Sequence, residues 1–260
     1  MNPSPLVSVV TPARNREDVL AEAVESVLEQ TMPEFELILV DDASTDGTRS
    51  VMHRYARLDR RVKVVANDAP SRGGPIEWEV RNNGLQLARG RHIAYLDSDN
   101  RWRPAFLERL SAVLEAHRHV QLVHCDACNH YGPGEVGAVL ARDRRTLRAS
   151  GPDWTIFSYD RLDATRLGSE IYIDTNEIMH RASVFHALGS LWRTAHPNRD
   201  RVNVRQWPRR PERRHNDLDL VERVIARFGD RSVAHVPEAL VDFYYPSAHR
   251  LGATPRASLA

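Results

Sequence analysis

The first hundred residues alternate short apolar runs with amphipathic segments, and this alternation constrains the fold more than any other feature of the chain. The apolar runs, rich in Val, Ile and Leu as in strands buried on both faces, are 7–10, 35–40, 62–65 and 92–96. Apolar residues recur at helical spacing in the intervening segments 16–30, 51–58 and 78–88. Such a β-α-β-α-β order predicts an α/β fold with a mostly parallel central sheet and helices on both faces.

Beyond residue 100 the periodicity is weaker but still marks several elements. The predicted helices are Pro104 to His117, a short one near 183–188, and one from about Asn216 to Phe228. Strands are predicted over 121–128 and 239–245, and the stretch 131–152 is expected to be irregular. Because no internal repeat or low-complexity linker interrupts the chain, residues 1–260 are expected to form a single domain.

The composition excludes several classes of protein. With 42% apolar and 27% charged residues, the chain is neither disordered nor fibrous. No apolar run approaches the roughly 20 residues of a membrane helix, and Leu6 to Val10 is too short for a secretory signal, so a cytoplasmic protein is expected. A net charge of +1 argues against a dedicated nucleic-acid binder.

Three polar clusters follow predicted strands: Thr11-Pro12, Asp41-Asp42 and Asp97-Ser98-Asp99. Ligands of open parallel sheets bind outside the carboxyl ends of the strands, where these clusters would lie. Neighbouring carboxylates repel one another, so such a concentration is best explained by a divalent cation or by ligand donors that offset the charge. Each cluster alone is also typical of ordinary turns and helix caps.

Taken together and in order, four motifs strongly resemble those of the family 2 glycosyltransferases, which have the GT-A fold. The motifs are VSVVTPARNRE at 7–17, FELILVDDASTDGT at 35–48, VRNNGLQLARGRHIAYLDSDN at 80–100 and NDLDLVERV at 216–224. The resemblance covers roughly residues 6–245. It implies a Rossmann-like nucleotide-sugar-binding half up to about residue 100, an acceptor and catalytic-base half over 101–248, and a tail over 249–260.

The chain also departs from the family. Many relatives have Glu-Asp where this chain has Asn216-Asp217, so the base is assigned to Asp217, with Asp219 as a nearby competitor. The membrane helices and extra domains common in the family are not found, which predicts a minimal catalytic domain. The stretch from Ile171 to Arg181 resembles a segment that some relatives have just before the acceptor side.

The resemblance implies roles for the strand-end residues. The donor site would contain Thr11, Pro12, Ala13, Glu17, Asp41, Asp42, Arg81, Asp97 and Ser98. Asp42, supported by Asp41, would accept a hydrogen bond from the nucleobase, and Arg81 would contact the nucleotide or its phosphates. A Mn²⁺ or Mg²⁺ ion would be held chiefly by Asp99, with Asp97 and His249 as further candidate ligands. Asp217 would take the proton of an acceptor hydroxyl.

These roles predict a metal-dependent, hexosyltransferase-type enzyme that inverts the anomeric centre. UDP is the family's commonest nucleotide, whereas GDP or dTDP would need only changed base contacts. The acceptor hydroxyl would belong to glycan, glycolipid or glycosylated-metabolite biosynthesis. An anionic or lipid-linked acceptor would bring the protein to the inner face of a membrane as a peripheral partner.

Two other functions are less well supported by the sequence. A nucleotidyltransferase on a similar sheet is disfavoured because no Gly-rich phosphate loop with a following arginine comes after the first strand. A degenerate sugar-binding protein is disfavoured because Asp97, Asp99 and Asp217 are all present.

Other features have a structural and a functional interpretation. Cys125 and Cys128 are predicted to be reduced residues packed beside a strand rather than zinc ligands. Packing is favoured over sugar stacking for the tryptophans Trp102, Trp154, Trp192 and Trp207. The segment from Arg193 to Arg214, with eight arginines and two acids, is either a solvated loop or a lid over the donor phosphates or an anionic acceptor.

Overall fold

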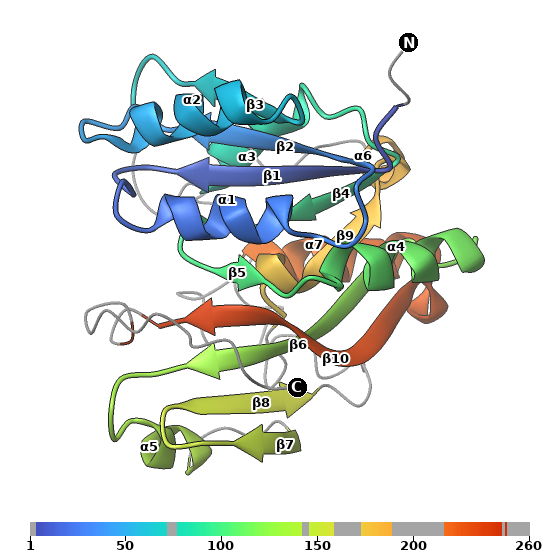
Figure 1. Ribbon diagram of the computed structural model, residues 1–260. Helices are drawn as coiled ribbons and strands as arrows, with labels where there is room; N and C mark the ends of the chain where they lie inside the picture. Colours follow the sequence, from blue (N-terminus) through green and yellow to red (C-terminus); the bar gives the residue numbers. More distant parts are fainter. Residues whose placement is uncertain are drawn as a thin grey trace, which may run out of the picture.

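The computed structural model describes residues 4–71, 77–141, 146–158, 173–188, 216–245 and 248. In these residues one sheet of ten strands runs through the molecule (Figure 1). The strands are β1 (Val7–Ala13), β2 (Phe35–Asp41), β3 (Val62–Ala66), β4 (His92–Tyr95), β5 (Arg101–Trp102), β6 (Leu122–His130), β7 (Thr146–Ser150), β8 (Trp154–Ser158), β9 (Ile178–Arg181) and β10 (Val233–Tyr244). Their order is β3-β2-β1-β4-β9-β6-β10-β5, and β8 joins β7 to β6.

The first four strands in this order are parallel, as the sequence predicts. β1 pairs with β2 from Val7 opposite Phe35 to Ala13 opposite Asp41, so the two strands end level with each other. β4 pairs only with the first half of β1, ending with Tyr95 opposite Val10. The residues that follow β1, β2 and β4 therefore meet at one edge of the sheet.

β1 is longer than predicted, because it continues through Thr11 and Pro12 instead of ending before them. The carbonyl of Val10 accepts from the amide of Leu96, so the backbone of Pro12, two residues on, faces the same side. β4 has already ended there. A missing N–H therefore costs no ladder hydrogen bond at this position.

The second half of the sheet is mixed. β9 lies antiparallel between β4 and β6, β10 runs parallel to β6, and β5 is antiparallel to β10. β10 begins at Val233, earlier than predicted, and its register against β6 shifts between Val236 and Ala239, where Pro237 interrupts the apolar pattern. The stretch expected to be irregular contains α5 (Val136–Leu140) and β7.

Helices cover both faces of the sheet (Figure 1). One face packs against α1 (Leu20–Leu28), α2 (Thr48–Leu58) and α4 (Phe106–Ala116). The other packs against α3 (Glu77–Leu85), α6 (Ser183–Leu188) and α7 (Asn216–Phe228). α6 and α7 span the predicted residues, and the expected α/β class with a mostly parallel sheet is confirmed.

α3 approaches the sheet closely at Gly84. A Cβ atom at this glycine would lie 2.7 Å from Val10 Cγ1 and 2.9 Å from Val40 Cγ2, closer than side-chain carbons pack. Glycine therefore lets α3 lie directly on β1 and β2. The close approach places Arg81, on the same helix, beside the carboxyl end of β4.

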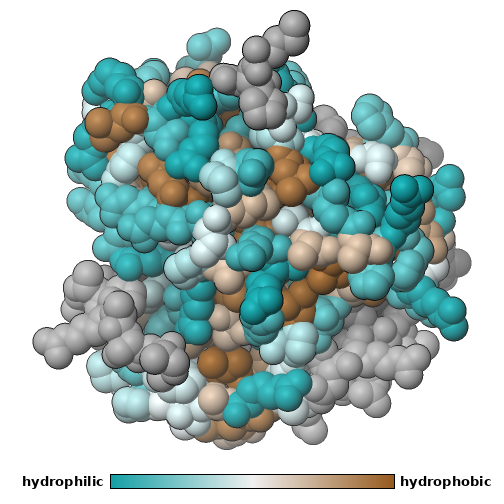
Figure 2. All heavy atoms as spheres, turned by 45° about the vertical axis from the view of Figure 1, so that its right-hand side comes forward, coloured by the Kyte–Doolittle hydropathy of each residue, from teal (hydrophilic) through white to brown (hydrophobic). Residues whose placement is uncertain are grey.

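Hydrophilic side chains cover most of the face drawn in Figure 2, with apolar atoms visible between them. Among the described residues, no helix has the length and apolar character needed to span a membrane.

Candidate active site

The site begins with Asp41 and Asp42, which lie next to each other but have different partners. Asp41 is fully buried and accepts from the Ser44 amide at 3.1 Å and from Arg49 Nε at 2.8 Å. Asp42 Oδ1 accepts from Asn67 Nδ2 at 2.9 Å and from the Ser71 amide at 3.0 Å. Asp41 thus holds the loop that enters α2, while Asp42 faces the segment after β3.

An open pocket of about 470 Å³ adjoins Asp42. Its lining is formed by 66–71 and by Asn83. Asn67 and Ser71 both line this pocket and hold Asp42, and Asn83 Nδ2 donates to Asn67 Oδ1 at 2.7 Å. A carboxylate with its orientation fixed by two donors therefore stands beside a polar hollow at the end of β2.

Asp97, directly beyond β4, is held at both carboxylate oxygens. Arg81, whose side chain is 1% exposed, donates from Nη2 to Asp97 Oδ1 at 2.5 Å and to Thr175 Oγ1 at 3.2 Å. Asn176 Nδ2 donates to Asp97 Oδ2 at 2.9 Å, and Asn176 Oδ1 accepts from the Asp97 amide at 2.6 Å. This carboxylate is consequently fixed in direction by two buried side chains.

Asn176 was not among the predicted site residues. It belongs to the 3₁₀ turn η1 (Thr175–Glu177), which precedes β9, and it is fully buried. Its backbone carbonyl accepts from Trp102 Nε1 at 2.8 Å, and Trp102 stacks on Phe106 at 3.9 Å, so this tryptophan packs in the core. The sequence signal was the polar run from Asp174 to Glu177 inside an apolar segment.

Asp99 and Asp42 each face an arginine of the β1–α1 loop. Arg16 Nη2 lies 3.7 Å from Asp99 Oδ2, and Arg14 Nη1 lies 4.0 Å from Asp42 Oδ2. Between the two arginines, Asn15 has φ 52°, in the left-handed region that Asn tolerates better than most residues. Its Oδ1 accepts from the Thr45 amide at 2.9 Å, which ties this loop to the one after β2.

Several other predicted residues lie at the same edge of the sheet. Thr11, Ala13 and Ser98 are buried, and Pro12 is buried within β1. Glu17 accepts from the Gly47 amide at 2.5 Å, where a carboxylate stabilises the beginning of α2. A nucleotide role for these residues, as for Arg81, stays a prediction.

The other half of the site is described less fully. Asp217 is in the first turn of α7, but its side chain is outside the described set, as is that of Asp219. His249 and the segment from Arg193 to Arg214 lie outside the described residues, as do Trp192 and Trp207. Their predicted roles remain predictions.

The donor chemistry of the strand-end acids fits a hard divalent cation. Asp99 is one-third exposed and offers carboxylate oxygens, the ligands that Mg²⁺ and Mn²⁺ prefer. The Arg16 guanidinium opposite Asp99 supplies positive charge beside this carboxylate, as a bound cation would. Asp99 and Asp97 therefore suit the ion expected from the sequence.

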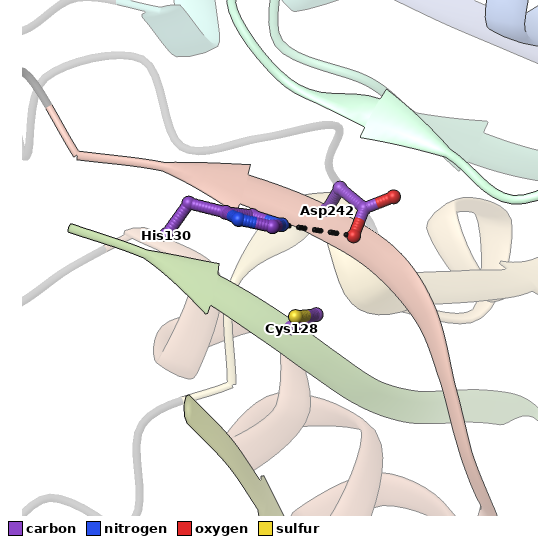
Figure 3. Close-up of side chains that lie close together, drawn as sticks. All are labelled: Cys128, His130 and Asp242. Carbon is purple, nitrogen blue, oxygen red and sulfur yellow. Dashed lines mark hydrogen bonds and ion pairs between the residues drawn. The ribbon is translucent and has the colours of Figure 1, made fainter. Parts of the chain in front are cut away.

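A second group of metal-ligand types lies at the ends of β6 and β10 (Figure 3). Cys128, His130 and Asp242 approach within 4.8 Å, and His130 Nε2 lies 3.0 Å from Asp242 Oδ1. Arg103 already donates to both oxygens of Asp242, at 3.1 and 3.4 Å. Burial raises the pKa of Cys128 to about 12, so its thiol stays protonated. This group is an internal charge network, and both Cys128 and Cys125 are free and buried in β6.

Comparison with known proteins gives the same family as the motifs. The sequence model of Glycosyl transferase family 2 matches residues 8–185. The putative teichuronic acid biosynthesis glycosyltransferase TuaG of Bacillus subtilis is 44% identical over 108 residues, which are 42% of this chain and 41% of that protein. The putative glycosyltransferase EpsE of the same organism is 42% identical over 124 residues, 47% of this chain and 43% of that protein. The chain thus spans less than half the length of these relatives.

Solved structures share the fold. TarS of S. aureus in complex with UDP-GlcNAc superposes with a TM-score of 0.63 at 19% identity, covering 98% of this chain and 62% of that one. The mannosyltransferase PcManGT of Pyrobaculum calidifontis, in complex with GDP-Man and Mn²⁺, gives a TM-score of 0.61 at 18% identity, covering 96% and 60%.

Three findings indicate the same family: the parallel strands of the first half, the acids at their carboxyl ends, and the matches to known proteins. The expected GT-A fold is confirmed by the structural neighbours. Because the family model matches more than half of its length, the chain belongs to glycosyl transferase family 2.

Proposed function

We propose that the protein is an inverting, metal-dependent glycosyltransferase that moves a sugar from a UDP-sugar to an acceptor hydroxyl. The observation that carries this proposal is the arrangement of Asp42, Asp97 and Asp99. A pocket-side carboxylate, a clamped carboxylate and a partly exposed carboxylate lie at one edge of the sheet.

The nucleotide would bind at the pocket beside Asp42. The carboxylate there is an acceptor only, so it would recognise a ring N–H of the base, a donor that both uracil and guanine possess. The structural neighbours hold UDP, UDP-GlcNAc and GDP-Man, and UDP is the donor nucleotide that we assign. Asp41 would act indirectly, by holding the loop that precedes α2.

Asp99, with Asp97, would hold Mn²⁺ or Mg²⁺. Such an ion, when bound, offsets the negative charge that builds on the diphosphate as the sugar–oxygen bond breaks. Arg81 and Asn176 would keep Asp97 aimed at this position. Arg81 would thereby act through Asp97 rather than by touching the nucleotide.

Asp217, in the first turn of α7, would accept the proton of the acceptor hydroxyl. The acceptor oxygen would form its bond to the anomeric carbon on the face opposite the departing diphosphate. One such displacement inverts the anomeric centre, and the nucleoside diphosphate leaves with the electron pair of the broken bond.

The acceptor is assigned only by class. TuaG is named for teichuronic acid biosynthesis, and the acid in that name supports an anionic acceptor, which we propose to be lipid-linked. We place the protein in the cytoplasm, with peripheral contact to the membrane where a lipid-linked acceptor would lie.

Calorimetry and ³¹P NMR test the proposal. UDP should bind tightly with Mn²⁺ and weakly in excess EDTA, and Asp99→Asn should lose this dependence. Asp59→Asn, at the far end of α2, is the matched control and should keep it. Equal UDP affinity in Mn²⁺ and EDTA would refute the metal role. Incubation with a UDP-sugar should release UDP. Release of a sugar 1-phosphate instead would indicate nucleotidyl transfer, and binding without turnover a degenerate protein.

A further inference from the structure

The strand-end acids of this site have two kinds of arginine partner. Asp41 and Asp97 have arginines at hydrogen-bond distance, 2.8 Å and 2.5 Å away, and the Asp41 side chain is fully buried. Asp99 and Asp42 instead face Arg16 and Arg14 across 3.7 and 4.0 Å. The first pairs are locked, whereas the second pairs are held by charge without a direct hydrogen bond.

The ion pair of Arg16 and Asp99 adds little to the stability of the fold, so either side chain can take a new partner at small cost. Their side chains are 44% and 33% exposed, and exposed ion pairs contribute little to folding. The backbone of Arg16 is nevertheless fixed, since its amide donates to Thr48 Oγ1 at 2.7 Å. A guanidinium on a long flexible stem thus starts from a fixed point beside the carboxylate assigned to the metal.

Charge balance gives an expectation for this pair when the donor binds. The charges of a divalent cation and of the donor's diphosphate cancel each other, so the net charge of the site does not change when both bind. Asp99 then has the cation as its partner, and the Arg16 guanidinium needs a new anion. A diphosphate offers oxygens that suit the guanidinium fork for paired hydrogen bonds.

We infer that Arg16 is an exchangeable partner of Asp99, which it neutralises before the donor arrives and leaves to bind the donor diphosphate once Asp99 holds the metal. This inference rests on the proposed function, because it needs a metal and a nucleoside diphosphate at this edge. Arg16 is then a binding residue for the diphosphate and a competitor of the metal ion. These two properties have opposite effects on two separate affinities.

The test is Arg16→Met, which removes the charge and keeps a long flexible side chain. Mn²⁺ affinity without nucleotide, measured from the EPR signal of free Mn²⁺, should rise by about two- to fivefold, since the competing cation is gone. UDP affinity at saturating Mn²⁺, measured by calorimetry, should fall by about tenfold, since a charge-assisted contact is lost. The effects should therefore have opposite signs.

Three variants serve as controls. Arg16→Lys keeps the positive charge and should leave Mn²⁺ affinity close to that of the wild type. Arg14→Met removes the other loop arginine, which faces Asp42, and should leave Mn²⁺ affinity unchanged. Arg57→Met, on the exposed last turn of α2, should change neither affinity.

The outcomes separate this inference from the proposed function. If the wild type binds Mn²⁺ and UDP but Arg16→Met weakens both, Arg16 has a merely structural role and the exchange is overturned. If Arg16→Met changes neither affinity, the contact has no function and the exchange is again overturned. If the wild type binds neither Mn²⁺ nor UDP, the proposed function fails and the inference fails with it.

Discussion

The clamp on Asp97, formed by its two hydrogen bonds with Asn176, gives the most demanding prediction, because a single buried amide side chain makes both bonds. Asn176→Ala removes the acceptor for the Asp97 amide and the donor to Asp97 Oδ2 and to Asp174 Oδ1. A neutral hydrogen bond contributes about 1 kcal/mol and one to a charged group about 1.5–3 kcal/mol. With one neutral bond and two bonds to carboxylates lost, the free energy of unfolding should fall by roughly 4 kcal/mol or more.

Asn176→Asp has the same shape and should be worse at pH 8. It places an oxygen where Nδ2 now donates to Asp97 Oδ2 across 2.9 Å and also to Asp174 Oδ1. Two unit charges that close repel by roughly 5–6 kcal/mol at an effective dielectric constant of about 20. This repulsion raises the pKa of the new carboxyl, so its excess cost over Asn176→Ala should shrink as the pH is lowered to 5 and a proton is taken up.

The assay is urea unfolding of both variants at pH 8, 6.5 and 5, with UDP affinity in Mn²⁺ at pH 8. In the presence of Mn²⁺, both variants should bind UDP at least tenfold more weakly than the wild type does, because Asp97 loses its orientation. Asn129→Ala is the control, since its buried amide donates only to the Ala127 carbonyl at 3.3 Å among the described contacts. It should leave UDP affinity unchanged.

The reasoning about the clamp is refuted by either of two results. One is an Asn176→Asp variant no less stable than Asn176→Ala at pH 8. The other is unchanged UDP affinity in a folded Asn176→Ala protein.

Three further predictions concern acid stability and the roles of the acids. Burial lowers the pKa of His124 to about 3 and that of His180 to about 4, from 6.5. Above pH 6.5 both histidines are neutral in the folded and the unfolded protein, and their contribution to stability is complete. As the pH falls from 6.5 toward the folded pKa values, the unfolded protein takes up protons first, and the free energy of unfolding falls by about 2 kcal/mol for each histidine by pH 5. Equal urea midpoints at pH 7.5 and 5 would contradict this. Asp42→Ala should raise the donor KM several-fold with kcat little changed, as steady-state kinetics would show, and an unchanged KM removes Asp42 from the site. Asp217→Asn should lower kcat by about 10²-fold or more while donor affinity stays within a few-fold; the reverse pattern, with Asp219→Asn inactive and Asp217→Asn active, would move the base to Asp219.

The periodicity of the sequence by itself determined most of the regular structure. β2, β3, β4, α2 and α7 follow from patterns of apolar residues within a few turns or strand steps, which local sequence encodes directly. The position of the strand-end acids was equally predictable from the sequence, since parallel strands bring their carboxyl ends together. The short strands β5 and β9 were not predictable, because two to four residues carry too little periodic signal.

Only the tertiary structure decided how the acids divide their roles. Asp41 and Asp42 are neighbours in sequence, yet Asp41 is bound to Arg49 in the first turn of α2 and Asp42 faces the pocket. Asn176 reaches Asp97 across 79 residues of chain because β9 inserts between β4 and β6. Local patterns fix which element a residue joins, whereas contacts between distant segments depend on the order in which strands pack, and that order is set by the whole core.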